Sequence, residues 1–460
     1  MQNLIQEAID YALTNSLLKF NTKYELVHAP LALTPYQISR ELLDKMTALT
    51  PLFNELMIKV SRDTGFLEMH LELTARTDDF VSALLDIQRE TGLTQADQLL
   101  ISRNDFLMSA QSDLPGVVAP KQVEFNTIAA SYPFLSGQLN HLHRFIFNSG
   151  RLGEKAGNIG GNVVENDPMK GIVEVMAEAV NQYGHQNACV LSIVQANEQN
   201  IFDQRGGEYA LWNKYGIPTL RYSLDEVASQ GSLREGHLMI QNRIAAVTYF
   251  RAGYTPEDYQ TADAWKGRQL IEASSSIAVP NISMQLAGLK KIQQVLANPK
   301  VLRSFVDEEA ARQIEATFVG LYLLNDLIEN PAGTEKASES ACRFPKNFVL
   351  KPQREGGGNN FYEEEMIQRL KTLNEDEREA YILMERINSP VHHARLMKEG
   401  DVQESNCISE IGSYGVCLTE GGVNRINRDV GYLVRTKMAD QNEGGVSAGY
   451  AYLNSLCHPV

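Results

Sequence analysis

The feature that most constrains the fold is an alternation of strand-like and helix-like segments across residues 188–282. The apolar run at 189–194 precedes a helical pattern that starts at about Asp203, and the run at 245–250 precedes another that extends through Trp265. Strands that alternate with helices are typical of an α/β unit, because each helix returns the chain to the same end of the sheet. We therefore predict a mainly parallel sheet here, consistent with a separate substrate domain.

The segments on either side have different patterns. Thr34 followed by Pro35 predicts a helix N-cap and a first helical residue. Apolar residues at spacings of three and four predict helices at 3–17, 34–60 and 79–90, and again from 284 to about 324. Strands are predicted at 99–103, 121–128 and 381–385 and within 407–434. No internal repeat or low-complexity segment stands out.

Composition restricts the class of protein. With 460 residues, 43% hydrophobic and 22% charged, we expect a soluble globular enzyme of about two to three domains. No apolar stretch approaches the roughly 20 residues of a membrane span, and the first ten residues lack the pattern of a secretion signal. The five cysteines are scattered, which predicts reduced thiols in the cytoplasm and argues against a disulfide framework or a zinc site.

The net charge of −15 argues against a nucleic-acid surface, since such surfaces need clustered lysines and arginines. In so acidic a chain, an anionic ligand would have to be held by local cations. Isolated lysines and arginines beside glycines are therefore stronger candidates for binding such a ligand.

One such cluster follows the apolar residues 348–350, where Lys351 and Arg354 flank a run that includes Glu355 and three glycines at 356–358. Glycine tolerates positive φ and has no Cβ, so successive N–H groups can turn toward a phosphate. The carboxylate adds a hard oxygen ligand of the kind that Mg²⁺ prefers. The spacing matches neither a Walker motif nor a dinucleotide fingerprint. The run favours a nucleoside triphosphate site, and a surface turn is the alternative.

A second candidate is the pair Glu124 and Asn126, which period two places on one face of the strand predicted at 121–128. Two oxygen ligands on one face suit Mg²⁺, and residues two apart start about 6.6 Å from each other along a strand. They could converge on one ion or serve two. The solvated face of an edge strand explains the same pattern.

Further candidates lie at strand ends and near small residues. Arg251 follows the strand-like run at 245–250 and Glu198 follows the run at 189–194, and ligands of open α/β sheets bind at such ends. Arg251 would grip a carboxylate and Glu198 would receive an amine. Lys290, in a helical segment, and Arg435 and Lys437, before the small-residue tail at 443–449, are further cations. Each pattern alone is also common on surfaces.

Taken together these segments resemble eukaryotic-type glutathione synthetase, an ATP-grasp ligase. The resemblance runs from about Arg103 to the C-terminus and is carried by several separated motifs in the same order. These motifs are residues 200–205, 285–288, 351–360, 382–385, 407–410, 435–437 and 444–446.

The resemblance implies a mixed α/β fold: an ATP-grasp fold with an inserted parallel α/β substrate-binding domain and an antiparallel, loop-rich lid. The implied parts are 1–185, the helical part with the first ATP-grasp strands; 186–285, the inserted domain; and 286–460, the ATP-grasp core and lid. The last part contains a glycine-rich loop at 351–362 and an alanine- and glycine-rich loop at 438–451.

The resemblance also implies the site residues. Magnesium ligands would be Glu124, Asn126 and Glu355. ATP would be bound by Glu124, Lys290, Lys351, Glu355, Gly356, Gly357, Asn359, Asn360, Tyr362, Met384, Glu385, Arg386, Ile387, Glu410, Lys437 and Glu443. The peptide and product site would be lined by Arg103, Ser131, Glu198, Asn200, Gln204, Arg251, Tyr254, Arg435, Val446 and Ser447. The catalytic residues would be Arg103, Glu124, Lys351 and Arg435, with Arg103 stabilising the developing negative charge.

The implied reaction joins γ-glutamylcysteine to glycine with ATP and Mg²⁺, through an acyl phosphate, in a cytoplasmic homodimer. Three positions depart from the family pattern: Ala129 replaces a common serine, Ser447 a usual alanine and Glu443 an aspartate. Glycine is the expected acceptor because serine at 447 is still small. The alternatives are a synthetase that uses β-alanine and, from another class, a non-catalytic ATP-binding paralogue.

Overall fold

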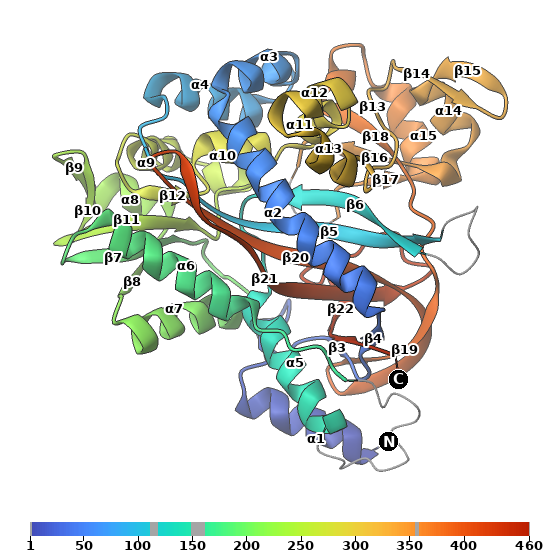
Figure 1. Ribbon diagram of the computed structural model, residues 1–460, viewed down its shortest axis with the longest axis horizontal. Coiled ribbons are helices and arrows are strands. Elements are labelled where there is room, and N and C mark those ends of the chain that lie inside the picture. The colour runs from blue at the N-terminus through green and yellow to red at the C-terminus, as the bar shows by residue number, and fades with distance from the viewer. Residues whose placement is uncertain (1, 111–117, 149–161, 355–357, 460) are drawn as a thin grey trace.

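The computed structural model describes residues 2–110, 118–148, 162–354 and 358–459. Helices and sheets are mixed throughout, and two large sheets lie side by side with helices against them (Figure 1). The mixed α/β class predicted from the sequence is confirmed.

The largest sheet has seven strands in the order β19-β3-β22-β21-β20-β5-β6. Its pairs are antiparallel except for β22 with β3, and β19 also pairs with the start of β20. The hairpin of β20 and β21 is its longest part. The strands are β3 (Leu31–Ala32), β5 (Leu99–Ala110), β6 (Val118–Asn126), β19 (His392–Lys398), β20 (Asp401–Glu420), β21 (Val423–Met438) and β22 (Ala451–Asn454).

The second sheet has six strands, and its pairings confirm the predicted mainly parallel unit. Strands β8, β7, β11 and β12 are parallel, while β10 pairs antiparallel with the start of β11 and, on its other side, with β9. The strands are β7 (Ala188–Ile193), β8 (Thr219–Tyr222), β9 (Gly231–Arg234), β10 (His237–Ile240), β11 (Arg243–Phe250) and β12 (Ile277–Val279). The associated helices are α6 (Pro168–Tyr183), α7 (Ile201–Tyr215), α8 (Leu224–Gln230), the 3-10 helix η2 (Pro256–Tyr259) and α9 (Ala262–Glu272).

A third, antiparallel sheet has four strands in the order β13-β18-β16-β17. Its apolar side chains pack on two helices in a small separate core that includes Leu350, Met366 and Leu383. The elements of this region are β13 (Leu321–Tyr322), β14 (Leu327–Asn330), β15 (Gly333–Lys336), α14 (Ala337–Arg343), η3 (Pro345–Asn347), β16 (Phe348–Pro352), β17 (Phe361–Tyr362), α15 (Glu363–Thr372), η4 (Glu377–Ala380) and β18 (Tyr381–Glu385).

Helices from two parts of the chain complete the fold. Helix α2 crosses one face of the seven-stranded sheet, where Phe53 packs against Phe106 of β5 and Phe125 of β6 (Figure 1). The remaining helices are α1 (Gln2–Thr14), α2 (Arg40–Arg62), α3 (Thr64–Ala75), α4 (Asp79–Thr91), α5 (Pro133–Asn148), α10 (Ile282–Ala287), α11 (Lys290–Leu296), α12 (Pro299–Phe305) and α13 (Glu308–Glu315). The short strands β1 (Leu18–Phe20) and β2 (Leu26–His28) pair with each other, and β4 (Tyr36–Gln37) pairs with β23 (Leu456–Cys457).

The predicted start of the second helix is wrong. Thr34 and Pro35 do not cap it; the N-cap of α2 is Ser39, whose side chain accepts a hydrogen bond from the Leu42 N–H. Tyr36 instead begins a short strand that pairs with the C-terminal segment. A distant partner strand therefore overrides the local helix signal.

The helices predicted from 284 to about 324 are four short ones. They are separated at Gly288–Leu289, and again at Asn298 and Asp307, whose side chains cap the next helices. The chain then turns into β13 at Leu321. Each cap satisfies orphan N–H groups, so a new helix starts where the pattern alone suggests continuation.

The two large sheets share their apolar cores. One buried cluster joins Leu84 of α4 and Phe106 of β5 to Leu191 of β7, and another joins Ile101 of β5 to Val190 of β7. In the described ranges, no helix is long and apolar enough to cross a membrane.

Candidate active site

A cleft of about 520 Å³ lies where the seven-stranded sheet, the four-stranded sheet and the C-terminal loop meet. Most of the predicted site residues line it, although they come from all parts of the chain. They are Arg103, Glu124, Asn126, Ser131, Tyr254, Lys351, Asn359, Asn360, Tyr362, Met384, Glu385, Arg386, Ile387, Glu410, Arg435, Lys437, Glu443, Val446 and Ser447.

Strand register brings the charged residues together. On β5 and β6, Arg103 lies opposite Asn126, and Asp105 lies opposite Glu124. On β20 and β21, Glu410 lies opposite Arg435. Because side chains two residues apart share a face, one face of the sheet carries this whole set.

Asp105 connects these side chains, and sequence reasoning missed it. Its fully buried carboxylate accepts two hydrogen bonds from Arg103, at 2.6 and 2.8 Å. It also accepts one from Asn126 Nδ2 at 3.0 Å and one from Arg435 Nη2 at 2.9 Å. Arg435 bonds to Glu410 as well. The available signal was its position two residues after Arg103, which places both on one face of the strand.

Glu124 is surrounded by cations. Burial would raise the pKa of its carboxyl, but Lys290, Lys351, Arg435 and Arg103 together lower that pKa to about 2. The Lys290 Nζ lies 3.9 Å from Glu124 Oε2. Glu124 is therefore ionised at any physiological pH.

Both lysines are anchored by backbone carbonyls. Lys351 Nζ donates to the Val123 oxygen at 3.0 Å, and Lys290 Nζ donates to the Arg354 oxygen at 2.6 Å. Lys290 does not line the main cleft; it lines a small neighbouring cavity with Lys351 and Met384. Burial lowers the pKa of Lys351. The two ammonium groups flank Glu124, where phosphate oxygens would enter.

The residues present fit a magnesium ion that takes most of its ligands from phosphate and water. Asn126 donates its amide nitrogen to Asp105 and to the Arg103 carbonyl, so its oxygen is the atom left for a cation. Glu124 supplies a carboxylate beside it. Within the described residues, no group of three or more His, Cys, Asp or Glu side chains could hold a metal alone. Mg²⁺ usually needs only one or two protein carboxylates beside substrate phosphates. Glu355, the third predicted ligand, lies outside the described residues, as do Gly356 and Gly357.

One end of the cleft is lined by residues 384–387. The Glu385 carboxylate is occupied, because it accepts from the Gly320 N–H at 3.1 Å and from the Tyr322 hydroxyl at 2.8 Å. Met384 and Ile387 therefore line the cleft with apolar side chains, beside a carboxylate that is already paired. Apolar side chains suit the face of a flat purine.

Two loops meet across the cleft. The Gly358 N–H donates to Glu443 Oε2 at 3.1 Å, which joins the glycine-rich run to the C-terminal loop. Lys437 Nζ donates to the Asn442 carbonyl at 2.5 Å within that loop. Ser447, further along, bonds to the hydroxyl of Tyr132. The C-terminal loop thus contacts both ends of the cleft.

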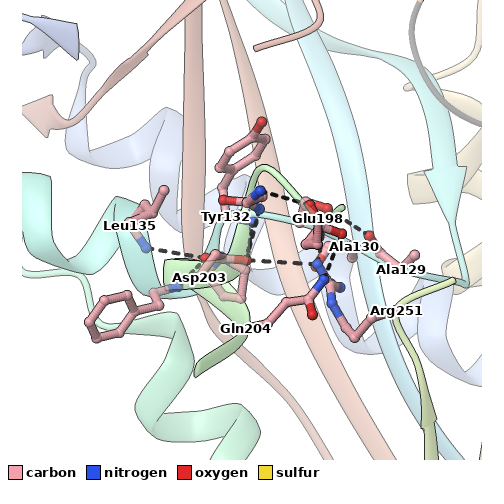
Figure 2. A network of polar contacts seen from close by, with 12 residues as sticks. Ala129, Ala130, Tyr132, Leu135, Glu198, Asp203, Gln204 and Arg251 are labelled. Carbon is pink, nitrogen blue, oxygen red and sulfur yellow. Dashed lines mark hydrogen bonds and ion pairs between the residues drawn. The ribbon is translucent and has the colours of Figure 1, made fainter. Parts of the chain in front are cut away.

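A second network lies beside the cleft at the carboxyl ends of β7 and β11 (Figure 2). Asp203, buried at the start of α7, accepts from the N–H groups of Tyr132, Phe134 and Leu135 at 2.8, 2.9 and 3.2 Å. Arg251 lies 3.8 Å from it. Burial raises the pKa of the Asp203 carboxyl, and Arg251 and the N–H donors counteract that rise. Asp203 thereby holds the residues 130–135 next to Arg251.

Arg251 contacts the cleft indirectly, through Ser131 of this loop. Its guanidinium donates to the Ala130 carbonyl and to Ser131 Oγ, both at 3.1 Å, and Ser131 lines the cleft. Arg251 itself lines a small cavity of about 30 Å³ behind the loop, together with Gln204. The strand-end rule placed Arg251 correctly at the end of β11.

The three other predicted peptide-site residues form a polar group at the start of α7. Glu198 accepts from the Asn200 N–H at 2.7 Å and from Gln204 Nε2 at 2.9 Å (Figure 2). Gln204 in turn accepts from Arg221 at 2.9 Å. Glu198 and Asn200 line neither of these two cavities.

Comparison with known proteins identifies the family. The family described as eukaryotic glutathione synthase, ATP binding domain, matches residues 1–458. The chain belongs to this family. It is 38% identical to the glutathione synthetase of Rattus norvegicus, over 99% of this chain and 96% of that protein. It is 37% identical to that of Homo sapiens with the same coverage, and 36% identical to the chloroplastic glutathione synthetase of Solanum lycopersicum, over 94% of this chain and 78% of that protein.

The fold has a relative among solved structures. A glutathione synthetase-like effector of Globodera pallida, solved in its apo form, superposes with a TM-score of 0.78 at 20% identity, covering 99% of this chain and 96% of that one. At that identity the likeness concerns the fold alone.

Against the expected glutathione synthetase pattern, two departures lie at the same place in the cleft. Ala129 and Ser447 both line it, near Tyr132. Ala129 and Tyr132 have φ of 50° and 77°, a left-handed conformation that side chains other than glycine rarely adopt. The hydroxyl of Tyr132 is the partner of Ser447. Neither Tyr132 nor Asp203 was predicted, because their roles depend on a turn that carries no periodic pattern.

Proposed function

We propose that this chain catalyses the ATP-dependent ligation of γ-glutamylcysteine and glycine to glutathione, with release of ADP and phosphate. The observation that carries the proposal is the convergence of Glu124, Lys351 and Arg435 in one cleft of a chain that belongs to this family. These residues come from three distant segments, and a phosphoryl transfer needs positioned cations and an oxygen ligand. The ATP-grasp arrangement, with residues 186–285 as an inserted domain, is part of the proposal.

ATP would lie with its phosphates among Lys290, Lys351 and Lys437. The purine would rest on the backbone of 384–387, and Glu410 would accept from the ribose. Asn359, Asn360 and Tyr362 would complete the wall beside the phosphates, together with Glu443. Concentrated cations offset the repulsion of the triphosphate by the net charge of −15.

Magnesium would be held by Glu124 and Asn126, with Glu355 as the third ligand. When bound, such an ion would neutralise the negative charge that develops during phosphoryl transfer. Asp105 and Arg103 orient Asn126 for this role through its amide nitrogen. Lys290 and Lys351 keep Glu124 ionised and ready to bind.

The peptide would extend from the other end of the cleft toward the start of α7. Arg251 and Ser131 would hold a carboxylate of γ-glutamylcysteine, and Glu198, Asn200 and Gln204 would receive its amine end. Tyr254, Val446 and Ser447 would enclose the cysteinyl and acceptor groups. The C-terminal carboxylate then attacks the γ-phosphorus, the bond to the ADP oxygen breaks, and an acyl phosphate forms.

The second step is attack of the glycine amine on the activated carbonyl, with loss of a proton and departure of phosphate. Arg103 and Arg435 stand where negative charge develops on the carbonyl and phosphate oxygens. The acyl phosphate is destroyed by water, so the loops that meet at Gly358 and Glu443 would exclude it. The chemistry asks for no nucleophilic serine or cysteine.

The test is ADP release with γ-glutamylcysteine and ATP plus glycine, then β-alanine, then no amino acid. Release that depends on glycine supports the proposal. A strong preference for β-alanine would replace the acceptor only. No turnover with any acceptor, from protein that binds ATP, would favour the non-catalytic paralogue instead.

We also propose a cytoplasmic homodimer. Near α1 and α7 the surface exposes the large apolar side chains of Leu13, Tyr24, Leu26, Tyr209 and Trp212, each 47–58% accessible. Tyr24 bonds to the Asn197 carbonyl, which joins the β1–β2 turn to the segment before α7. Exposed apolar side chains of this kind suit contact with a second copy of the chain. Sedimentation of the wild type beside Trp212→Lys checks it, with dissociation of the variant as the expected result.

A further inference from the structure

We infer that Asp105 is a positioning residue of the active site, and that the absence of a side chain at Gly412 leaves the space that Asp105 occupies. The inference rests on the proposed function and assigns a role to two residues that would touch neither ATP nor peptide. Asp105 is fully buried and is the common partner of Arg103, Asn126 and Arg435.

Asp105 fixes the orientation of these side chains. Each of these three side chains has other rotamers available, and a buried carboxylate with four donated hydrogen bonds selects one of them. For Asn126 the consequence is chemical: since its Nδ2 points at Asp105, its Oδ1 faces away, as a cation ligand must. Outer-shell partners of this kind fix the orientation of metal ligands.

Asp105 also balances the positive charges of the two arginines. Arg103 and Arg435 lie against the same carboxylate, and Arg435 also pairs with Glu410. Two guanidinium groups this close repel each other unless an anion lies between them. Asp105 is that anion, and Glu410 balances the second charge. Burial would lower the pKa of Arg103, but Asp105 raises it, so the guanidinium stays charged.

Gly412 leaves space for the Asp105 and Arg103 side chains. Gly412 of β20 lies opposite Asp105 in the sheet. A Cβ at Gly412 would lie 2.4 Å from Asp105 Oδ1, 2.7 Å from Arg103 Cδ and 2.9 Å from Arg103 Cγ. Any side chain there would displace the pair. The missing side chain lets Asp105 reach over β20 to Arg435 on β21.

Gly415, three residues along the same strand, is a matched control. A Cβ there would be equally crowded, 2.6 Å from Asn54 Oδ1 and 2.6 Å from Ser102 Oγ. These contacts lie on the opposite face of the sheet, toward α2. Gly415→Ala should therefore destabilise the strand as Gly412→Ala does, without disturbing the active site.

The experiment compares wild type, Asp105→Asn, Gly412→Ala and Gly415→Ala as full-length chains. The first readout is the rise in melting temperature caused by ADP with Mg²⁺ over ADP alone, which reports metal-dependent binding without turnover. The second is the Mg²⁺ concentration that gives half-maximal ligation. For Asp105→Asn and Gly412→Ala we expect that concentration to rise about 10- to 100-fold and the Mg²⁺-dependent stabilisation to shrink. Gly415→Ala should keep both wild-type values.

Wild-type metal dependence in both Asp105→Asn and Gly412→Ala would overturn the inference, as would an equal loss in Gly415→Ala. If Asp105→Asn fails to fold, Gly412→Ala and Asp105→Glu test the inference in its place. Both variants keep the negative charge of the carboxylate at position 105 but change where it lies. A wild type that binds ADP with Mg²⁺ but ligates no acceptor would refute the proposed function and leave the positioning role standing.

Discussion

The two ends of the cleft are held in different ways. At the end that carries Glu124, the guanidinium groups of Arg103 and Arg435 are held by the side chain of Asp105 on the seven-stranded sheet. At the peptide end, charged side chains are held by main-chain groups of nearby turns. Asp203 accepts from three N–H groups, and Arg251 donates to the Ala130 carbonyl.

The difference indicates how each end tolerates change. Side chains fixed across a sheet depend on register, and a substitution there alters the orientation of several charges at once. Side chains fixed by turns depend on local backbone, including the left-handed residues Ala129 and Tyr132. We therefore expect changes in the side-chain network around Asp105 to affect turnover, and changes at the peptide end to affect substrate binding.

The largest effect is expected for Glu124→Gln. The pKa of this carboxyl is about 2, so its charge is present throughout the working range of pH, and the amide removes it. We expect kcat to fall about 10²- to 10³-fold, as for loss of a group that stabilises transition-state charge. Steady-state ADP release at saturating substrates measures it.

Glu385→Gln is the matched control for this prediction. Glu385 lines the same cleft, but its carboxylate is occupied by Gly320 and Tyr322. We expect Glu385→Gln to lower kcat less than about tenfold, since it weakens hydrogen bonds to Gly320 and Tyr322 and removes no charge from the reacting groups. Equal losses in the two variants would remove the distinction between a reacting and a structural carboxylate.

Arg251→Lys is expected to act on binding. Lysine keeps the charge but cannot donate to Ala130, Ser131 and Tyr249 together as the guanidinium does. We expect the KM for γ-glutamylcysteine to rise about 10- to 100-fold with kcat changed less than about threefold, because uniform binding is lost.

Its control is Arg243→Lys, at the other end of the same strand. Arg243 bonds to Asn187 at 3.3 Å and is remote from the cleft. We expect wild-type kinetics from it. A fall in kcat for Arg251→Lys as large as that of Glu124→Gln would show that the two ends do not divide binding from turnover.

Sequence reasoning recovered what local patterns encode. Lys351 lies near the end of one strand, five residues before Gly356, and Arg251 lies directly after another, so strand-end and glycine rules singled out both residues. Asp105 and Gly412 were out of reach, because their importance comes from a register between strands about 300 residues apart in the chain. No spacing in the sequence specifies that pairing.

The same limit explains the errors in the fold. The second helix starts at Arg40 and not near Thr34, since Tyr36 pairs with Leu456 at the far end of the chain. Asp203 was not singled out because an acid in the first turn of a helix is common. Asp203 becomes important only in the folded chain, because the turn at 130–135 donates three N–H groups to its carboxylate.

The opposite face of the seven-stranded sheet is expected to control the pH dependence of stability. Asp429 of β21 accepts from Thr50 of α2, and burial raises the pKa of its carboxyl to about 7. Because the folded pKa exceeds the unfolded one, stability is greatest below about pH 4 for this group and is lost as pH rises toward about 7.

Asp429→Asn should flatten that dependence. The side chain is partly accessible, so we expect a difference of about 1 to 2 kcal/mol in the free energy of unfolding between pH 4 and pH 8, less than a fully buried group would give. Urea unfolding of both proteins across this range measures it. A slope that survives in Asp429→Asn would assign the dependence to the charged groups of the cleft instead.

The smallest effect, and the finest test of the peptide end, concerns Tyr132 and Ser447. Their hydroxyls bond to each other across the cleft, and this contact joins the C-terminal loop to the turn that Asp203 holds. One neutral hydrogen bond is worth about 1 kcal/mol, so Ser447→Ala should raise the KM for glycine about three- to tenfold and leave kcat nearly unchanged. Tyr132→Phe should do the same, and the double variant should do no more than either, because both remove one interaction. Additive losses would mean that each hydroxyl acts on its own, so that the turn and the loop do not position the acceptor together.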